Sequence, residues 1–160
     1  MAATLTKAPM RYSPATTRSL LVAALALLTL PACGWIRRDP SVTVRVQGDA
    51  RMNFVNDRPN AAVVRIYKHA SRANFDRASR AALWQDDSAA LGGELLARRE
   101  VTLLPEAQEA LELELRKGAR FVAVAADFYN PDGDGWRVVY PASPKKPIRV
   151  RLGERQISSR

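Results

Sequence analysis

The sequence predicts a mainly β protein, folded as a two-sheet β-sandwich with one helical insertion. About seven short segments are rich in β-branched, aromatic or alternating apolar residues, and turn-forming residues separate them. Between the second and third segments, apolar residues recur with helical spacing instead. A chain of 160 residues, 47% of them hydrophobic, suits one folded domain and excludes two large ones.

Residues 1–32 predict a lipoprotein signal peptide. Three basic residues, Lys7, Arg11 and Arg18, precede the apolar run 20–30, and no acidic residue occurs before Asp39. A membrane-spanning helix needs about 20 apolar residues, so this run is too short to be one.

The end of the apolar run, Leu30-Pro31-Ala32-Cys33, resembles a bacterial lipobox, in which the peptidase cuts before the Cys. A thiolate readily takes up a diacylglyceryl group, so Cys33 is the predicted lipid-attachment residue. Several acyl chains on one residue make desorption from the membrane negligible. Gly34 resembles the residue that follows the Cys in lipoproteins sorted to the outer membrane. A buried core Cys and an ordinary signal peptide with a free thiol are the alternatives.

Export also changes the charge of the protein. Removing the signal peptide lowers the formal net charge from +9 to +6, because all three of its charged residues are basic. An exported protein with scattered arginines is not predicted to bind nucleic acid. Its mild positive charge fits anionic lipid headgroups or an acidic protein partner.

Residues 33–40 are predicted to form an acylated tether, in which Trp35 and Ile36 either dip into the membrane interface or lie in a solvated linker. The folded domain is predicted to span residues 41–160. Its first strand, 42–47, alternates apolar and polar residues.

The second strand, 61–68, is rich in β-branched residues. Residues 49–60 lie between these two strands and are too many for a simple hairpin. Long loops in compact domains are often functional, so this loop is a candidate site.

A helical insertion is predicted at about residues 71–97. Residues 74–84 place Phe75, Ala78, Ala82 and Leu83 on one helical stripe. Residues 87–97 are ambiguous, because Gly92-Gly93 would weaken a continuous helix. The remaining predicted strands are 100–104, 111–115, 121–129, 136–140 and 148–152, and the predicted core aromatics are Phe121, Phe128 and Trp136.

No catalytic, cofactor-binding or metal-binding residue is predicted. His69, the only imidazole, has no recognisable nucleophile motif beside it and is predicted to lie at the surface of a strand end. Glu112 and Glu114 alternate with leucines and should point into solvent. Residues 130–135 match the opening of a calcium loop, but position twelve is Pro141 instead of Glu, so a turn is predicted.

The signal peptide with its lipobox, the strands and the helical insertion, in this order along the chain, resemble the type VI secretion outer-membrane lipoprotein family, called TssJ or VasD. Lys68-His69 and Glu106-Ala107 depart from the family's usual residues. The segments that carry the resemblance are the lipobox, Arg58-Pro59, Val63–Tyr67, the helix near Phe75 and Leu83, Val101–Pro105, Phe121–Val124 and Trp136-Arg137.

The resemblance implies a transthyretin-like β-sandwich with a helical insertion, anchored in the outer membrane and facing the periplasm. It further implies a binding protein rather than an enzyme. Its implied partner is the periplasmic carboxy-terminal domain of the inner-membrane subunit TssM, and TssL joins the same membrane complex.

In such proteins the loop between the first two strands contacts the inner-membrane subunit. We expect three apolar anchors inside a polar rim. The anchors are Met52, Phe54 and Val55, and the rim is Arg51, Asn53, Asn56 and Arg58. Alternatively, Phe54 packs back onto the sandwich.

Two other classes of function stay open. One is a periplasmic lipoprotein that binds a glycan or peptidoglycan fragment, with Trp84 or Trp136 as the stacking platform. The other is a hydrolase with a site that carries no recognisable motif.

Overall fold

The computed structural model describes residues 40–159, except 116, 117 and 144. The predicted signal peptide, the lipobox residues Leu30, Pro31 and Ala32, the lipid-attachment residue Cys33 and all of the tether before Pro40 lie outside the described residues. No helix in the described part of the chain is long and apolar enough to span a membrane.

The described residues form eight strands, two α-helices and one 3-10 helix. In chain order these are β1 Ser41–Gly48, β2 Ala62–His69, α2 Ala73–Arg77, α3 Arg80–Leu91, η2 Gly92–Glu94, β3 Leu95–Leu103, β4 Gln108–Glu114, β5 Phe121–Ala126, β6 Arg137–Pro141, β7 Ile148–Leu152 and β8 Ile157–Ser159.

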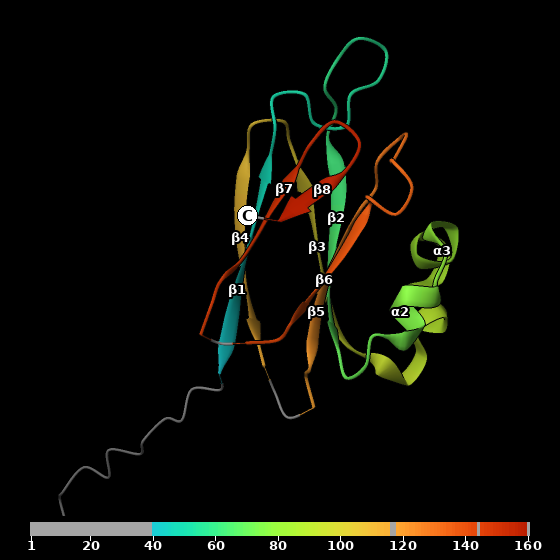
Figure 1. The fold of residues 1–160 in the computed structure, drawn as a ribbon, viewed down its shortest axis with the longest axis vertical. Helices are drawn as coiled ribbons and strands as arrows, with labels where there is room; N and C mark the ends of the chain where they lie inside the picture. The colour runs from blue at the N-terminus through green and yellow to red at the C-terminus, as the bar shows by residue number, and fades with distance from the viewer. Residues whose placement is uncertain (1–39, 116–117, 144, 160) are drawn as a thin grey trace, which may run out of the picture. The chain divides into compact units, whose positions relative to one another are not determined.

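The strands form two four-stranded sheets, in the orders β4-β1-β7-β8 and β3-β2-β5-β6 (Figure 1). Only the β1–β7 pair is parallel, and all the other neighbouring pairs are antiparallel. The predicted β-sandwich with a helical insertion after the second strand is therefore confirmed.

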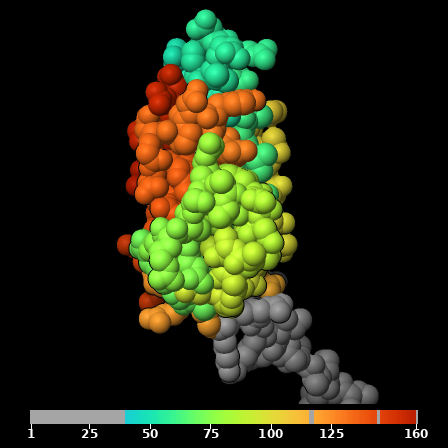
Figure 2. All heavy atoms as spheres, turned by 90° about the vertical axis from the view of Figure 1, so that its right-hand side faces the viewer, coloured from blue at the N-terminus to red at the C-terminus, as the bar shows by residue number. Residues whose placement is uncertain are grey.

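The sandwich core follows from the strand patterns. In β1 the alternating Val42, Val44 and Val46 are buried between the sheets. In β5 nearly every residue is buried, because the insertion covers the outer face of its sheet (Figure 2). Ala123 and Ala125 lie on that outer face, beside Tyr67 and Arg65 of β2, and their small side chains leave room for the insertion.

The insertion resolves the ambiguous residues 87–97. Ser79 caps α3 by accepting a hydrogen bond from the Ala82 N–H at 3.2 Å. The helix ends at Gly92, whose φ of 55° favours a residue without a side chain. Strand β3 then begins at Leu95, so the insertion ends three residues before the predicted boundary.

His69 is buried, and its prediction as a surface residue was wrong. Its exposed fraction is 0%, and its ring lies 5.7 Å from the ring of Tyr67 and 5.3 Å from that of Phe75. Because α2 folds back over the end of β2, the strand end is covered. Burial lowers the pKa of His69 to about 4, although Glu94 and Asp76 favour the charged form.

A buried carboxylate fastens α3 to the second sheet. Asp87 is 5% exposed, and its Oδ2 lies 2.8 Å from Arg98 Nη1 and 3.7 Å from Arg65 Nη1. The same Arg65 donates a hydrogen bond to the Leu83 carbonyl at 2.8 Å and lies over the Trp84 ring at 4.3 Å. Arg65 and Asp87 therefore hold the insertion against β2 and β3.

Replacing Asp87 with Asn should lower the free energy of unfolding by about 2 kcal/mol, because the half-buried Arg65 and the exposed Arg98 lose their shared buried carboxylate. Urea denaturation of the purified protein measures this change. Asp86→Asn is the matched control, since Asp86 is exposed and its side-chain oxygen accepts a hydrogen bond from Ala89 N, which an amide oxygen can also do. Equal losses from the two variants would contradict this role for Asp87.

The structure also tests the predicted burial of single side chains and the predicted ends of the strands. Glu112 and Glu114 are exposed, and Phe128 and Trp136 are buried, as predicted, whereas Phe121 is only half-buried. Strand β5 ends three residues earlier than predicted, at Ala126, and β8 was not predicted.

Residues 130–135 form part of the connection between β5 and β6, with Gly133 at a φ of 51°. The two carboxylates of this segment each pair with an arginine. Asp132 lies 2.9 Å from Arg155, and Asp134 lies 3.2 Å from Arg137. The predicted turn is confirmed.

Candidate functional site

The β1–β2 loop, residues 49–61, lies at the end of the sandwich opposite to Pro40, where the described domain begins (Figure 1). Strand β1 connects these two ends, and its eight residues span about 25 Å. The β3–β4, β5–β6 and β7–β8 connections share the loop's end, because the strands before them run in the same direction as β1. A chain tethered before residue 40 thus presents this loop at its far end.

The base of the loop is part of the domain core. Met52 is fully buried, and its Sδ would lie 2.8 Å from a Cβ added at Gly48, so only glycine fits there. The backbone N–H groups of Asn53 and Phe54 donate to the Gly153 and Glu154 carbonyls at 3.1 and 3.3 Å. These bonds fix the first half of the loop to the β7–β8 turn.

The Asn53 amide joins three segments. Its Nδ2 donates to the Ala61 carbonyl at 2.8 Å, and its Oδ1 accepts from the Tyr129 N–H at 2.8 Å. With a φ of 48°, Asn53 also has the left-handed backbone that Asn tolerates better than most residues. Asn53 is therefore a structural residue of the loop, and its side chain is buried.

The tip of the loop is a tight hairpin turn. Val55 and Arg58 exchange backbone hydrogen bonds of 3.0 and 3.3 Å, and Asn56 and Asp57 between them have φ values of 52° and 56°. Two successive positive φ values define a type I′ turn, which Asn and Asp favour. Asn60 Nδ2 donates to the Arg58 carbonyl at 2.9 Å and stabilises the turn. The tip is thus held in one conformation and protrudes from the domain (Figure 2).

The loop residues divide into buried and surface groups. The buried side chains of Met52 and Asn53 are not available at the outer surface, so the expected anchor role of Met52 and rim role of Asn53 do not fit the structure. Phe54 and Val55 are half-buried, and Arg51, Asn56 and Arg58 are exposed.

The Phe54 ring is neither free nor fully packed onto the sandwich. The Arg51 guanidinium lies 4.0 Å from the centre of this ring, and Arg51 Nε pairs with Glu154 at 3.1 Å. Pairing with Glu154 positions Arg51 over the ring, which leaves an aromatic and cationic pair at the surface.

Two exposed apolar residues near the loop were missed by the sequence analysis. Leu104 is 59% exposed and Tyr129 is 63% exposed, and each follows the end of a strand. The sequence pattern places both residues in strands and therefore predicts no surface position for them. The backbone N–H of Tyr129 donates a hydrogen bond to Asn53 in the loop. The Leu104 carbonyl would lie 2.7 Å from a Cβ added at Gly48, the residue directly before the loop. Both residues therefore adjoin the loop.

We call the set of Arg51, Phe54, Val55, Arg58, Leu104 and Tyr129 the loop-end surface. It contains aromatic and aliphatic side chains beside arginines, a composition that is enriched at protein–protein contacts. The sequence signal that could have located Leu104 is the Pro105 that follows it and ends the strand.

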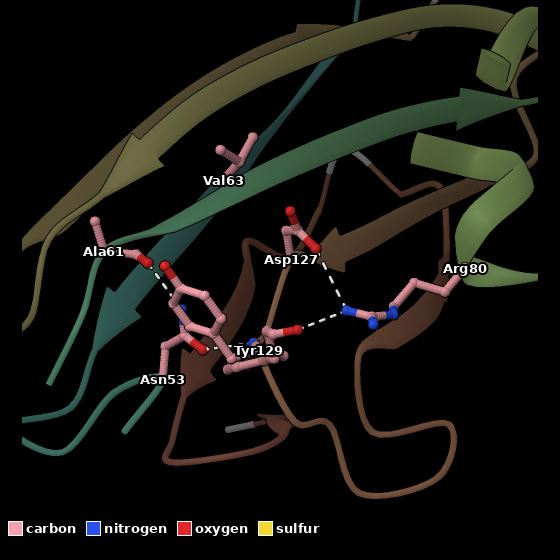
Figure 3. Close-up of a pocket in the computed structure, with 7 residues that line it drawn as sticks. Asn53, Ala61, Val63, Arg80, Asp127 and Tyr129 are labelled. Atoms are coloured by element: carbon pink, nitrogen blue, oxygen red, sulfur yellow. Dashed lines mark hydrogen bonds and ion pairs between the residues drawn. The ribbon is translucent and has the colours of Figure 1, made fainter. Parts of the chain in front are cut away.

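A cavity of about 410 Å³ adjoins the loop-end surface, between the loop and the start of α3 (Figure 3). Arg80 Nη1 donates to the Phe128 carbonyl at 2.5 Å and lies 3.4 Å from Asp127 Oδ1, and Asn53 and Tyr129 line the cavity on the loop side. The charged groups drawn there therefore already have partners within the protein.

The structure also bears on the stacking platforms considered for a glycan. Trp136 is buried, and Trp84 is half-buried with the Arg65 guanidinium over its ring. In the described residues, no group of three or more His, Cys, Asp or Glu side chains could hold a metal ion.

Residues 40–155 match a protein family described as type VI secretion lipoprotein, VasD, EvfM, TssJ. This match covers the domain from the residue before β1 to the β7–β8 turn. No curated protein matches the chain.

Solved structures match over the same part of the chain. One is the Lip protein of Serratia marcescens, a membrane bound component of the type VI secretion system. It is 22% identical to this chain with a TM-score of 0.70, and the match covers 76% of this chain and 96% of that chain. A chain in a structure of a type VI membrane complex is 27% identical, with a TM-score of 0.70 and coverage of 76% and 98%. A chain in a structure of the type VI secretion protein TssM C-terminal domain from EAEC is 28% identical, with a TM-score of 0.67 and coverage of 74% and 99%.

Proposed function

Because this chain belongs to the type VI secretion lipoprotein family of VasD, EvfM and TssJ, we propose that it binds a TssM-type inner-membrane subunit and assembles the membrane complex of a type VI secretion system. The protein acts from the outer membrane, held by acyl chains on Cys33, and faces the periplasm. It is a binding protein and not an enzyme, and TssL joins the complex with the TssM-type subunit.

The family match over residues 40–155 is the observation that carries this proposal. Two related chains support the partner. One occurs in a type VI membrane complex and the other in a structure of the TssM C-terminal domain. Both relatives are covered almost completely, so the likeness extends over their whole length.

The geometry of the domain suits this role. The predicted anchor precedes residue 40 at one end, and the loop-end surface lies at the other, about 25 Å away along β1. An anchor confines the protein to the membrane plane and raises its effective concentration towards a partner that crosses the periplasm. A small contact surface can then suffice.

Within the loop-end surface, Phe54 and Tyr129 are the proposed centres of the contact. Aromatic and arginine side chains contribute most of the binding energy at many protein interfaces. Phe54 is preordered by Arg51, and the backbone of Tyr129 is fixed by Asn53, so little conformational entropy is lost on binding.

Replacing Tyr129 or Phe54 with Ala should each weaken binding to the periplasmic C-terminal domain of the TssM-type subunit by about 10- to 30-fold, since each change removes an aromatic contact worth about 2 kcal/mol. Biolayer interferometry with the immobilised domain measures the dissociation constant.

Leu96→Ala provides the control for this experiment. Leu96 is an apolar side chain that is 41% exposed, but it lies near the start of β3, at the opposite end of the sandwich. Its replacement should leave the affinity unchanged, and thermal melting should show that all three variants fold. Wild-type affinity in both the Phe54 and Tyr129 variants would remove the loop-end surface from the proposal.

A further inference from the structure

The strand connections at the two ends of the domain differ in charge. Three connections start and end at the end that holds Pro40. Two of them, residues 115–120 and 142–147, contain no acidic residue, whereas the helical insertion, residues 70–94, contains four acidic residues and three arginines. The connections at the loop end contain seven acidic residues. These are Asp49, Asp57, Glu106, Asp127, Asp132, Asp134 and Glu154.

Three cations define the surface at the first of these ends. Arg120, Lys145 and Lys146 are exposed, and we call them the tether-end surface. Arg116 and Lys117 belong to the same connections in the sequence but lie outside the described residues, so the surface is defined without them.

Backbone hydrogen bonds place this surface beside the start of the domain. The Leu115 N–H donates to the Pro40 carbonyl at 2.6 Å, and the Ala142 N–H donates to the Arg120 carbonyl at 2.8 Å. The second connection leads into β7 at Ile148, which lies opposite Val44 in the parallel β1–β7 pair. Both connections therefore flank the point where the tether enters.

The tether-end cations have no partners within the described part of the protein. No side chain of Arg120, Lys145 or Lys146 makes an ion pair or hydrogen bond with a described residue. Glu112, on the neighbouring strand β4, accepts a hydrogen bond from Ser41 Oγ at 2.5 Å.

The arginines at the loop end differ in this respect. Arg51, Arg151 and Arg155 each pair with a carboxylate, namely Glu154, Asp49 and Asp132. All three cations of the tether-end surface are thus without an ion pair among the described residues. The same holds for Arg58 at the loop tip, and for Arg45, Arg99 and Arg149 on the strands between the two ends.

We propose that the tether-end surface seats directly on anionic phospholipid headgroups of the membrane that holds the anchor. This inference rests on the proposed lipid attachment at Cys33. The seven residues that precede Pro40 in the mature chain, 33–39, span at most about 25 Å, so the domain cannot leave the neighbourhood of the headgroups. Charge attraction acts within about 10 Å at physiological salt, which requires close approach of the three cations.

Contact of the tether-end surface with the headgroups would orient the domain relative to the membrane. The acidic loop end then points away from the like-charged membrane, and the loop-end surface faces the periplasm. The anchor by itself would not fix the direction in which the loop points.

Vesicle binding by the mature chain from residue 33, carrying Cys33→Ser so that no acyl chain contributes, tests the proposal. Each Lys or Arg near an anionic surface contributes about 1 kcal/mol, so the triple variant Arg120→Gln, Lys145→Gln, Lys146→Gln should bind vesicles of phosphatidylethanolamine and phosphatidylglycerol about 100-fold more weakly. Cosedimentation measures the bound fraction, and vesicles of phosphatidylethanolamine alone should bind neither protein.

A pair of single variants provides the matched control. Lys146→Gln and Arg58→Gln each remove one unpaired cation, but only the first lies at the tether end, so the first should lose about fivefold and the second nothing. Equal losses of vesicle binding from the two variants would overturn the proposal. Wild-type protein that does not bind vesicles containing phosphatidylglycerol would overturn it as well.

The affinity of the triple variant for the TssM-type domain, measured without vesicles, should be unchanged. A loss of that affinity with intact vesicle binding would identify the surface as a protein contact and overturn the proposal. If only the predicted vesicle binding is not observed, the membrane proposal fails and the proposed function still stands.

Discussion

Replacing Cys33 with Ser should remove the protein from the outer membrane and stop assembly of the membrane complex, while leaving the fold intact. Each buried acyl methylene contributes about 0.8 kcal/mol, so the loss of several chains changes an irreversible attachment into a weak one. To avoid an uncleaved signal peptide, residues 1–32 of the variant are replaced by an ordinary cleavable secretory signal. The variant should then appear in the soluble periplasmic fraction.

Pro31→Ser provides the matched control for this substitution. It changes the residue two positions before Cys33 to one that lipoboxes more often contain, so the protein should stay in the outer membrane. Mass spectrometry of protein made by its native host should find acyl chains on residue 33. An unmodified Cys33 there, or a Cys33→Ser protein still in the outer-membrane fraction, would refute the anchor.

Acidification from pH 7 to pH 4 should lower the free energy of unfolding by about 3 kcal/mol through His69 alone. The pKa of His69 falls from 6.5 to about 4 on folding, chiefly because burial disfavours the charged ring. The unfolded chain therefore binds a proton from about pH 6.5 downward, and the folded protein does so only near pH 4. Stability is complete above pH 6.5 and is lost progressively below it, at about 1.4 kcal/mol per pH unit.

His69→Leu should remove this part of the pH dependence. Carboxylates titrate in the same range, so the measured quantity is the difference between wild type and variant in urea denaturation from pH 7 to pH 4. The chain has a single histidine, so nuclear magnetic resonance of the imidazole reports its pKa directly in the folded protein. A measured pKa near 6.5, or parallel pH curves for the two proteins, would contradict the prediction.

The strand patterns of this sequence predict most of the sandwich because burial in a strand leaves a local signature. The alternating valines of β1 and the long apolar run of β5 locate a strand with one covered face and a strand with two. Strand β8, with its three residues, has no comparable pattern and was missed.

The candidate site was predicted less completely. The length of the β1–β2 loop predicted it as a candidate site, and the assignment of that loop to partner binding remains a prediction. Which of its side chains reach the surface depends on residues distant in sequence. Met52 is buried beside Gly48 and the carbonyl of Leu104, and Asn53 is held by Ala61 and Tyr129.

The sequence by itself determined the order of the main strands and the place of the insertion, and it is the sole basis for the predicted export signal and the predicted anchor at Cys33. These features depend on local composition and periodicity, which neighbouring residues specify. Only the tertiary structure decided that His69 is buried, that Tyr129 and Leu104 lie beside the loop, and that Arg120, Lys145 and Lys146 gather at the end where the tether enters. Each of these depends on which chain segments pack together, and contacts between distant residues leave no pattern in any single stretch of sequence.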